Sequence, residues 1–231
     1  RFVPSCTSEL MTGLAKLAKE YNVPVQSHLS ENHGEIDWVA SLHPESSNYT
    51  DVYYEHHLMG TVPTVMAHCI HLSDVEMDRM AETQTMVSHC PYSNVNLSSG
   101  IAPIRKLFER NIPIGLGSDI SGGHIVSMAK VLTEAIGLSK MKWAEVDPNY
   151  APLTLSEAFY MATKGGGQFF GHVGSFENGC ELDALIIDDT SLFDPNERSL
   201  EERLERWLYV GDDRHIIERY VAGRVVPSPK G

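Results

Sequence analysis

Four residues that can bind a metal ion or transfer a proton stand at the ends of four successive apolar runs: His28, His68, His89 and Asp119. Imidazole nitrogen and carboxylate oxygen are ligand types that zinc accepts in catalytic sites, which leave one position open to water. Bound zinc lowers the pKa of that water to about 7, so hydroxide becomes available at neutral pH. The pattern therefore predicts metal-assisted hydrolysis, provided that the fold brings the four run ends together.

Glu31 and His89 each allow two interpretations. Glu31 closely follows His28, and a carboxylate in that place can take a proton from the attacking water and pass it to a leaving group. Alternatively, Glu31 is an exposed residue at the start of a helix, where the helix dipole favours negative charge. His89 ends its run in the expected way, but the segment 89–94, His-Cys-Pro-Tyr-Ser-Asn, can instead shape the edge of the site through hydrogen bonds.

Strand and helix patterns alternate along the first part of the chain. Strand-like runs are expected at 23–28, 64–68, 85–89 and 112–119. Helical patterns are expected after Thr7, with apolar positions Leu10, Met11, Leu14, Leu17 and Ala18, then over 35–42, after a capping box at 73–76, over 101–110 behind a Ser/Asn-rich loop, and over 127–143. This alternation predicts parallel strands joined by right-handed crossovers, whose carboxyl ends lie on one edge.

Polar groups at the carboxyl ends of all four runs favour a β/α barrel, because barrel chemistry is located on that rim. A closed barrel of this kind has eight strands, and the sequence contains four such runs before the pattern changes. The predicted fold class is therefore α/β: residues 1–170 form the second half of a TIM-like (β/α) barrel, strands five to eight. The glycine-rich segment 164–168 is interpreted as a helix–helix junction, because no strand leads into it and the P-loop Lys-Ser pair is absent.

The pattern changes at Gly171. Strands are expected at 179–187 and 219–226, with acidic turns and a helix near 201–207 between them. We therefore expect residues 171–231 to form the C-terminal part of a small β-rich appendage domain.

Composition excludes several classes of function. The net charge is −13, with 31 acidic and 18 Lys or Arg residues, so a phosphate backbone is repelled and nucleic acid is not an expected partner. No apolar run reaches the roughly 18 residues that cross a bilayer, so no membrane partner is expected. Four cysteines without a C-x-x-C pair predict reduced thiols and a cytoplasmic location. The chain begins without methionine or an apolar leader, and we expect it to be part of something longer.

Six segments resemble the amidohydrolase superfamily and, within it, the guanine deaminase family: 1–6, 26–32, 65–68, 89–100, 115–123 and 209–214. The Gln-Ser-His-Leu-Ser-Glu and Gly-Leu-Gly-Ser-Asp motifs are shared with related cyclic deaminases. The Arg-Phe start and the Tyr-Val-Gly-Asp-Asp-Arg segment narrow the resemblance to guanine deaminases. The resemblance implies a zinc-dependent barrel that hydrolyses guanine, a small purine base, to xanthine and ammonia.

The resemblance also implies a role for each site residue. His28 would bind zinc from the fifth strand, and Asp119 would bind zinc from the eighth and help to activate water. His68 would lie near the metal and steady the attacked centre, while Glu31 would shuttle the proton. His28, Glu31 and Asp119 would also contact the substrate.

Arg1 and Phe2 are implied by the resemblance alone, Arg1 as a hydrogen-bond donor to the polar edge of the base and Phe2 as a surface that packs on its face.

One departure from the family matters. Its first two zinc ligands form an H-x-H pair after the first barrel strand, and this chain contains no H-x-H. The resemblance therefore implies one zinc ion per site with two further histidine ligands upstream, the N-terminal half of the same enzyme as a partner, and a homodimer. Two alternatives remain: a relative that deaminates another ring, such as 8-oxoguanine, a pterin or a triazine, and a non-catalytic barrel scaffold.

Overall fold

The computed structural model describes residues 1–227. A parallel sheet forms its first part, with strands β1 (Val25–Leu29), β2 (Thr64–His68), β3 (Met86–His89) and β4 (Ile114–Leu116) in that spatial order. Each strand pairs in parallel with the next one along the chain, for example Val25 with Thr64 and Val87 with Ile114. All four carboxyl ends therefore lie on one edge of the sheet, and the predicted α/β class with parallel pairing is confirmed.

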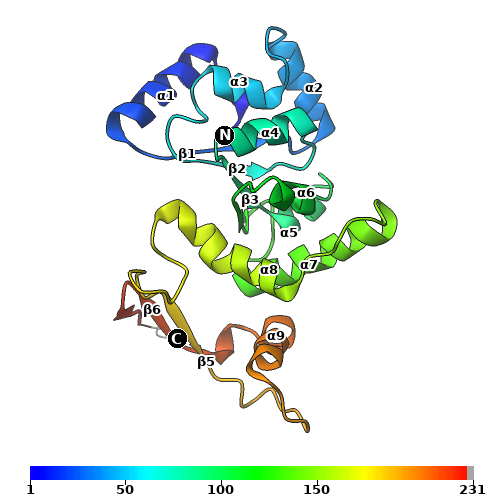
Figure 1. Cartoon of the computed structure of the whole chain (residues 1–231), viewed down its shortest axis with the longest axis vertical. Helices are drawn as coiled ribbons and strands as arrows, with labels where there is room; N and C mark the ends of the chain where they lie inside the picture. Colours follow the sequence, from blue (N-terminus) through cyan, green and yellow to red (C-terminus); the bar gives the residue numbers. More distant parts are fainter. Residues whose placement is uncertain (228–231) are drawn as a thin grey trace.

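Helices connect the strands (Figure 1): α1 (Ser8–Tyr21), α2 (His33–Leu42), α3 (Tyr49–Glu55), α4 (Asp74–Glu82), α5 (Pro91–Asn96), α6 (Ile104–Glu109), α7 (Met128–Glu145) and α8 (Leu155–Tyr160). A short 3-10 turn, η1 (Val3–Ser5), precedes α1. The predicted caps are present: Thr7 accepts a hydrogen bond from the backbone of Leu10, and Ser73 forms a capping box with Glu76. Local side-chain chemistry therefore fixes where these helices begin.

Helix α1 has the predicted span but not the predicted buried face. Met11, Ala15 and Ala18 are buried, whereas Leu10, Leu14 and Leu17 are 44–50% exposed. The apolar positions extend around the helix beyond the stripe that faces the rest of the protein, and within residues 1–227 nothing covers the leucine side. Helical spacing identified the helix, but it did not identify which side of it is packed.

Three further expectations were wrong in detail. Residues 91–96, expected as a loop, form α5 with Pro91 in the first turn, where its missing N–H costs nothing. Strand β4 is shorter than the run at 112–119, so Asp119 lies beyond its end. The helix expected over 101–110 begins only at Ile104, because Pro103 occupies its N-cap. These boundaries depend on proline positions and on close packing that periodicity does not encode.

The glycine-rich segment is a helical junction, as predicted. A π-helical turn η2 (Met161–Gly165) follows α8, and a 3-10 turn η3 (Gln168–Phe170) follows in turn. The segment packs directly on β4: a Cβ atom at Gly115 would lie 2.8 Å from the Cα atom of Gly166. Glycine is therefore required here for close backbone approach, and no phosphate-binding role is needed to explain it.

The core lies between the sheet and its helices. Fully buried side chains include Leu29, Met66, Val87 and Ile114 from the strands, and Met80, Leu107, Leu132 and Met161 from the segments around them. Strands β2 and β3 show no regular alternation of buried and exposed residues, as expected where both faces of a parallel sheet are covered.

The last part of the chain contains an antiparallel sheet of β5 (Ala184–Ile187), β6 (Ile216–Val221) and β7 (Arg224–Val225), with α9 (Leu200–Val210) between the first two. A 3-10 turn, η4 (Asp213–His215), leads into β6. Helix α9 packs on α7, and Lys130 of α7 donates hydrogen bonds to the carbonyls of Leu208 and Tyr209. Figure 1 shows β5, β6 and α9 at the opposite end of the molecule from α1–α4. The helix expected near 201–207 is present, and the strand expected at 179–187 is present but shorter. The run 219–226, expected as one strand, instead holds the end of β6, a turn at Ala222 and Gly223, and the antiparallel strand β7.

The predicted domain division, 1–170 and 171–231, remains a prediction, and its last residues, 228–231, lie outside the described part of the chain. No helix in residues 1–227 has the length and apolar character to span a membrane.

Candidate active site

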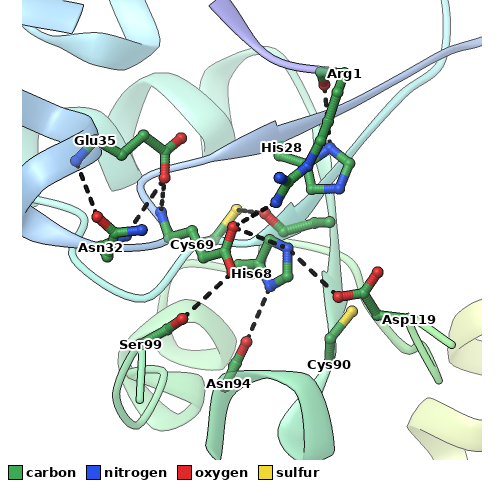
Figure 2. Close-up of polar contacts among 12 residues, drawn as sticks. Arg1, His28, Asn32, Glu35, His68, Cys69, Cys90, Asn94, Ser99 and Asp119 are labelled. Atoms are coloured by element: carbon green, nitrogen blue, oxygen red, sulfur yellow. Dashed lines mark hydrogen bonds and ion pairs between the residues drawn. The ribbon is translucent and has the colours of Figure 1, made fainter. Parts of the chain in front are cut away.

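The carboxyl edge of the parallel sheet brings together the side chains that the sequence singled out (Figure 2). The ring centroids of His28 and His68 lie 5.2 Å apart. The Nε2 atom of His68 lies 3.6 Å from Oε2 of Glu31 and 3.9 Å from Oδ2 of Asp119. Two imidazoles and two carboxylates from β1, β2 and the segment after β4 therefore share one small volume.

His68 is the innermost member of this group. Its side chain is fully buried, and its Nδ1 atom lies 2.9 Å from Oδ1 of Asn94. Its Nε2 atom, which faces the two carboxylates, has no hydrogen-bond partner within the described residues. A buried polar atom without a hydrogen-bond partner is uncommon in proteins, and this one lies within ion-pair distance of Glu31 and Asp119.

The backbone at His68 makes this placement possible. His68 has φ = 72° and Cys69 has φ = 52°, both in the left-handed region that non-glycine residues seldom adopt. The turn is held by the backbone N–H of Cys69, which donates to the carbonyl of Leu29, and by that of Ile70, which donates to Ser30. Asp119 also has positive φ, 42°. Such conformations concentrate at functional sites, where the surrounding structure enforces them.

His28 is tethered through a backbone carbonyl. Its Nδ1 atom lies 3.1 Å from the carbonyl oxygen of Arg1, which also accepts a hydrogen bond from the Ser27 hydroxyl at 2.8 Å. Because the carbonyl only accepts, Nδ1 carries the proton and Nε2 keeps its lone pair. Burial lowers the pKa of His28, which favours the neutral imidazole that binds metals. His28 therefore has the state and the tether expected of a metal ligand.

Glu31 is buried, contrary to the interpretation of an exposed residue at the start of a helix. Its side chain is only 6% exposed, and its Oε2 atom lies 2.8 Å from the guanidinium of Arg1. Its Oε1 atom accepts a hydrogen bond from the hydroxyl of Ser99 at 3.3 Å. Its backbone N–H donates to Glu35, the N3 residue of the capping box that begins α2. Burial with three partners favours a chemical role for this carboxylate.

Arg1 and Phe2 lie beside Glu31. The Arg1 guanidinium carbon lies 5.1 Å from the centroid of the Phe2 ring, within range of a cation–π contact. Phe2 in turn meets the edge of Trp38 at a centroid distance of 6.3 Å. The two residues that came from the resemblance alone therefore lie close to those that strand ends identified.

His89 ends β3 and is 2% exposed. Burial, aided by the field of His68, lowers the pKa of His89 to about 3, so its ring is neutral at physiological pH. Burial likewise raises the pKa of the adjacent Cys90 thiol to about 12, so that thiol stays protonated. Neither side chain is an anionic nucleophile or a proton carrier near neutral pH.

A large cavity of about 1520 Å³ opens against this edge and the inner face of the sheet. Its wall includes His28 and Asp119, inward residues of the strands such as Val65 and Ala67, and Trp207 from α9. Within residues 1–227, no group of three or more His, Cys, Asp or Glu side chains is arranged to hold a metal ion.

The family model of the amidohydrolases matches residues 1–226. The chain belongs to the amidohydrolase family. A guanine deaminase from Dictyostelium discoideum is 44% identical over 233 residues, covering 98% of this chain and 51% of the relative. A crystal structure of a guanine deaminase from C. acetobutylicum with bound guanine matches with a TM-score of 0.95 and 53% identity, over 98% of this chain and 54% of that one.

A zinc-bound adenosine deaminase from Xanthomonas campestris, 22% identical with a TM-score of 0.81 over 95% of this chain and 48% of that one, shows the fold alone. This amidohydrolase chain spans about half the length of the curated relatives that it matches. The resemblance to amidohydrolases, and among them to guanine deaminases, is thereby confirmed, and the structural neighbours support a TIM-like barrel as the architecture.

Three further polar residues take part in this amidohydrolase site: Glu35 and Ser99, which were not identified from the sequence, and Asn94, which was included there only as the end of the segment 89–94. Each contacts a predicted site residue rather than ending a strand. Only the capping box around Glu35 had a local signal, Asn32 followed by Glu35. The alternative in which segment 89–94 shapes the edge of the site through hydrogen bonds is consistent with the Asn94 contact.

Proposed function

We propose that this chain is part of a zinc-dependent guanine deaminase, which hydrolyses guanine to xanthine and ammonia. The observation that carries the proposal is the convergence of His28, His68, Glu31 and Asp119 at one edge of the sheet, with Nε2 of His68 facing both carboxylates. The 44% identity to a guanine deaminase across nearly the whole chain supports guanine as the substrate.

In this proposal residues 1–170 supply strands five to eight of the barrel, and residues 171–231 supply the C-terminal part of the appendage domain. The parallel order β1-β2-β3-β4 supports it, since β1 and β4 have no outer neighbour within the described residues. The N-terminal half of the same enzyme would pair with these edges and close the cavity. A cytoplasmic location and a homodimer belong to the same proposal and rest on composition and on the resemblance.

Zinc would be held by His28 and Asp119 of this chain, together with two histidines supplied from outside it. The donor set fits, because His28 presents a lone pair at Nε2 and Asp119 presents carboxylate oxygens on the same edge. When bound, zinc supplies a hydroxide nucleophile near neutral pH.

The residues of this chain would then carry the protons. The reaction joins the oxygen of water to the ring carbon that bears the amino group, and the bond from that carbon to the amino nitrogen breaks. Glu31 would take a proton from water on Oε2 and deliver it to the purine. Of the two protons of water, one ends on the departing nitrogen, which leaves as ammonia, and the other on a ring nitrogen, so that the attacked carbon keeps a carbonyl oxygen. His68, whose Nε2 lies 3.6 Å from Oε2 of Glu31, would stabilise the charge that develops at the attacked centre when Nε2 also carries a proton to donate. Asp119 would help to hold the water.

Arg1, Phe2, His28, Glu31 and Asp119 would contact the base. Arg1 carries guanidinium donors at the mouth of the site and is about half exposed, so it can reach a polar ring edge. Phe2 offers an aromatic face of the kind on which purines stack. Arg1 is paired with Glu31 at 2.8 Å, so binding of the base would exchange one hydrogen-bond partner of Arg1 for another.

The test is ammonia release by the zinc-loaded full-length protein supplied with guanine. Equal measurements with 8-oxoguanine, a pterin and a triazine separate guanine from the other rings, and exchange of Arg1 for leucine should reduce turnover of guanine most. Unchanged guanine in the presence of stoichiometric zinc would refute the proposal. A full-length protein that retains neither zinc nor iron would instead favour the non-catalytic scaffold.

A further inference from the structure

The segment between β3 and α6 contacts both His68 and Glu31. Asn94, in α5, places its Oδ1 atom 2.9 Å from Nδ1 of His68 (Figure 2). Ser99 donates its hydroxyl to Oε1 of Glu31 at 3.3 Å. We propose that Asn94 and Ser99 are positioning residues that decide which atom of His68 and which oxygen of Glu31 face the reaction. The kinetic part of this inference rests on the proposed deaminase function, whereas the hydrogen bonds themselves do not require a substrate.

Asn94 determines the ring atom that His68 presents. An amide oxygen can only accept a hydrogen bond, so contact with Oδ1 requires a proton on Nδ1 of His68. The other ring nitrogen, Nε2, is then the atom left to interact with Glu31, with Asp119 or with a substrate, whatever the charge of the ring. The distances of 3.6 Å and 3.9 Å to the two carboxylates place Nε2 there already.

Of the two polar atoms of the Asn94 amide, only the oxygen has a hydrogen-bond partner within the described residues. The side chain of Asn94 is fully buried, and its Nδ2 atom has no hydrogen-bond partner among residues 1–227. A buried asparagine that served only the packing of the loop would be expected to satisfy both ends of its amide. The acceptor end alone is engaged, and it is engaged by His68, which favours a role in holding that ring.

Ser99 makes the two oxygens of Glu31 different from each other. Oε1 is engaged by the Ser99 hydroxyl, while Oε2 faces Nε2 of His68 and the Arg1 guanidinium. Oε2 is therefore the oxygen free to exchange a proton once Arg1 moves to a substrate. Ser99 is itself fixed from two sides, because its N–H donates to the backbone carbonyl of Asn94 at 2.8 Å and its own carbonyl lies 2.8 Å from Nε2 of His71.

Asn94 therefore acts on both groups. Its side chain orients His68, and its backbone carbonyl holds the residue that orients Glu31. These contacts connect β1, β2 and the segment after β3, so a change at Asn94 would alter two reacting groups together.

Matched substitutions in the full-length, zinc-loaded protein test the role of Asn94. Asn94→Asp keeps an oxygen acceptor of the same shape but exchanges the amide N–H₂, which has no hydrogen-bond partner among residues 1–227, for a second carboxyl oxygen that brings negative charge. Asn94→Leu removes the acceptor at similar volume. We expect Asn94→Leu to lower kcat for guanine by about 10- to 100-fold with KM and zinc content little changed, as for other groups that orient catalytic side chains. Asn94→Asp should retain kcat within about tenfold of the parent.

A spectroscopic measurement keeps this test independent of activity. The ¹⁵N resonances of His68, assigned by comparison with a His68→Gln variant, should show the proton on Nδ1 in the parent and in Asn94→Asp, and a changed pattern in Asn94→Leu. A proton on Nε2 alone in the parent, or equal loss of kcat in both variants, would overturn the role of Asn94. If the parent shows the Nδ1 proton but does not deaminate guanine, the proposed function fails while the hydrogen-bond assignment stands.

Ser99→Ala tests the second contact, with Ser98→Ala as its control, because Ser98 is an exposed neighbour with no side-chain hydrogen bond in the described structure. We expect Ser99→Ala to lower kcat by about 3- to 10-fold, since a 3.3 Å hydrogen bond to a carboxylate is long. Ser99→Thr, which retains the hydroxyl, should recover part of that loss. Equal activity of the Ser99→Ala and Ser98→Ala proteins would overturn the role of Ser99.

Discussion

Two regions of this molecule are rich in ionisable side chains, and they use them in opposite ways. At the carboxyl edge of the parallel sheet, Glu31 and His68 are almost completely buried and their contacts are specific to single atoms. In the segment 189–214, arginines such as Arg203 and Arg214 form ion pairs with aspartates at the protein surface. Ionisable side chains lie close together in both regions, but only at the sheet edge are Glu31 and His68 buried away from water.

This difference in exposure matters because solvent determines how strongly a charged side chain interacts with its neighbours. Exposed ion pairs are screened and have little effect on stability, whereas buried groups interact strongly and must be matched by partners. The Nε2 atom of His68, which faces two carboxylates and has no hydrogen-bond partner among residues 1–227, is therefore informative. An ion pair such as Arg203 with Asp189 is ordinary. We therefore expect substitutions at the sheet edge to change activity or metal binding, and substitutions in segment 189–214 to change activity and stability very little.

Glu31→Gln should have the largest effect. The substitution retains the shape of the side chain and its contact with Ser99 but removes the group that carries the proton. Turnover of guanine should fall by about 10²- to 10⁴-fold, as for loss of a general acid–base group, with zinc content unchanged. Steady-state ammonia release and metal analysis on the same preparation measure both quantities. Loss of zinc in this variant would make Glu31 a ligand instead.

His28→Asn should act on metal binding first. If His28 is a ligand, zinc affinity should fall by more than the roughly 10- to 100-fold that follows loss of a residue behind a ligand. Competition with a chromogenic chelator measures the affinity directly. His57→Asn is the control, because His57 is exposed and has positive φ, which asparagine also tolerates. Equal zinc affinity in the two variants would remove His28 from the metal site.

The sheet edge was predictable because parallel strands turn sequence order into spatial order. His28, His68 and Asp119 each follow an apolar run, and consecutive pairing alone was needed to bring them together. Asn94 was not predictable in this way, since its contact with His68 depends on the path of a helix that begins at Pro91. Nor was the packed side of α1, because Leu10 and Met11 have the same apolar character and differ only in which way they face.

Arg105 forms an ion pair whose exposure is intermediate between those of the two regions. Its contribution to stability can therefore be measured directly. The guanidinium of Arg105 binds both carboxylate oxygens of Glu157, at 2.6 Å and 3.0 Å, and joins α6 to α8. Hydrogen bonds from Arg105 lower the pKa of Glu157 to about 2 from 4.5. A depressed carboxyl pKa contributes stability that is complete above pH 4.5 and is lost as the pH falls toward 2.

Arg105→Gln should therefore lower the free energy of unfolding by about 1 kcal/mol at neutral pH, a value reduced for the solvent that reaches the pair. Urea unfolding of parent and variant should converge between pH 4.5 and 2, the interval over which Glu157 takes up its proton. Arg110→Gln, at the C-cap of the same helix, is the control, because Arg110 pairs with aspartates that are 68% exposed. A difference that persists at the acid end would place the effect of Arg105 in packing or in its hydrogen bonds to the carbonyls of Ala151 and Pro152 rather than in the ion pair.

Arg203→Gln should have the smallest effect. Its guanidinium makes two 2.8 Å contacts with Asp189, so by distance alone it resembles the Arg1–Glu31 pair. Its side chain is 52% exposed, however, and water replaces the lost contacts at little cost. The urea midpoint and the guanine turnover of this variant should match those of the parent. A clear fall in the midpoint would mean that segment 189–203 is more deeply coupled to the core than its exposure indicates, and a fall in turnover would extend the functional region beyond the sheet edge.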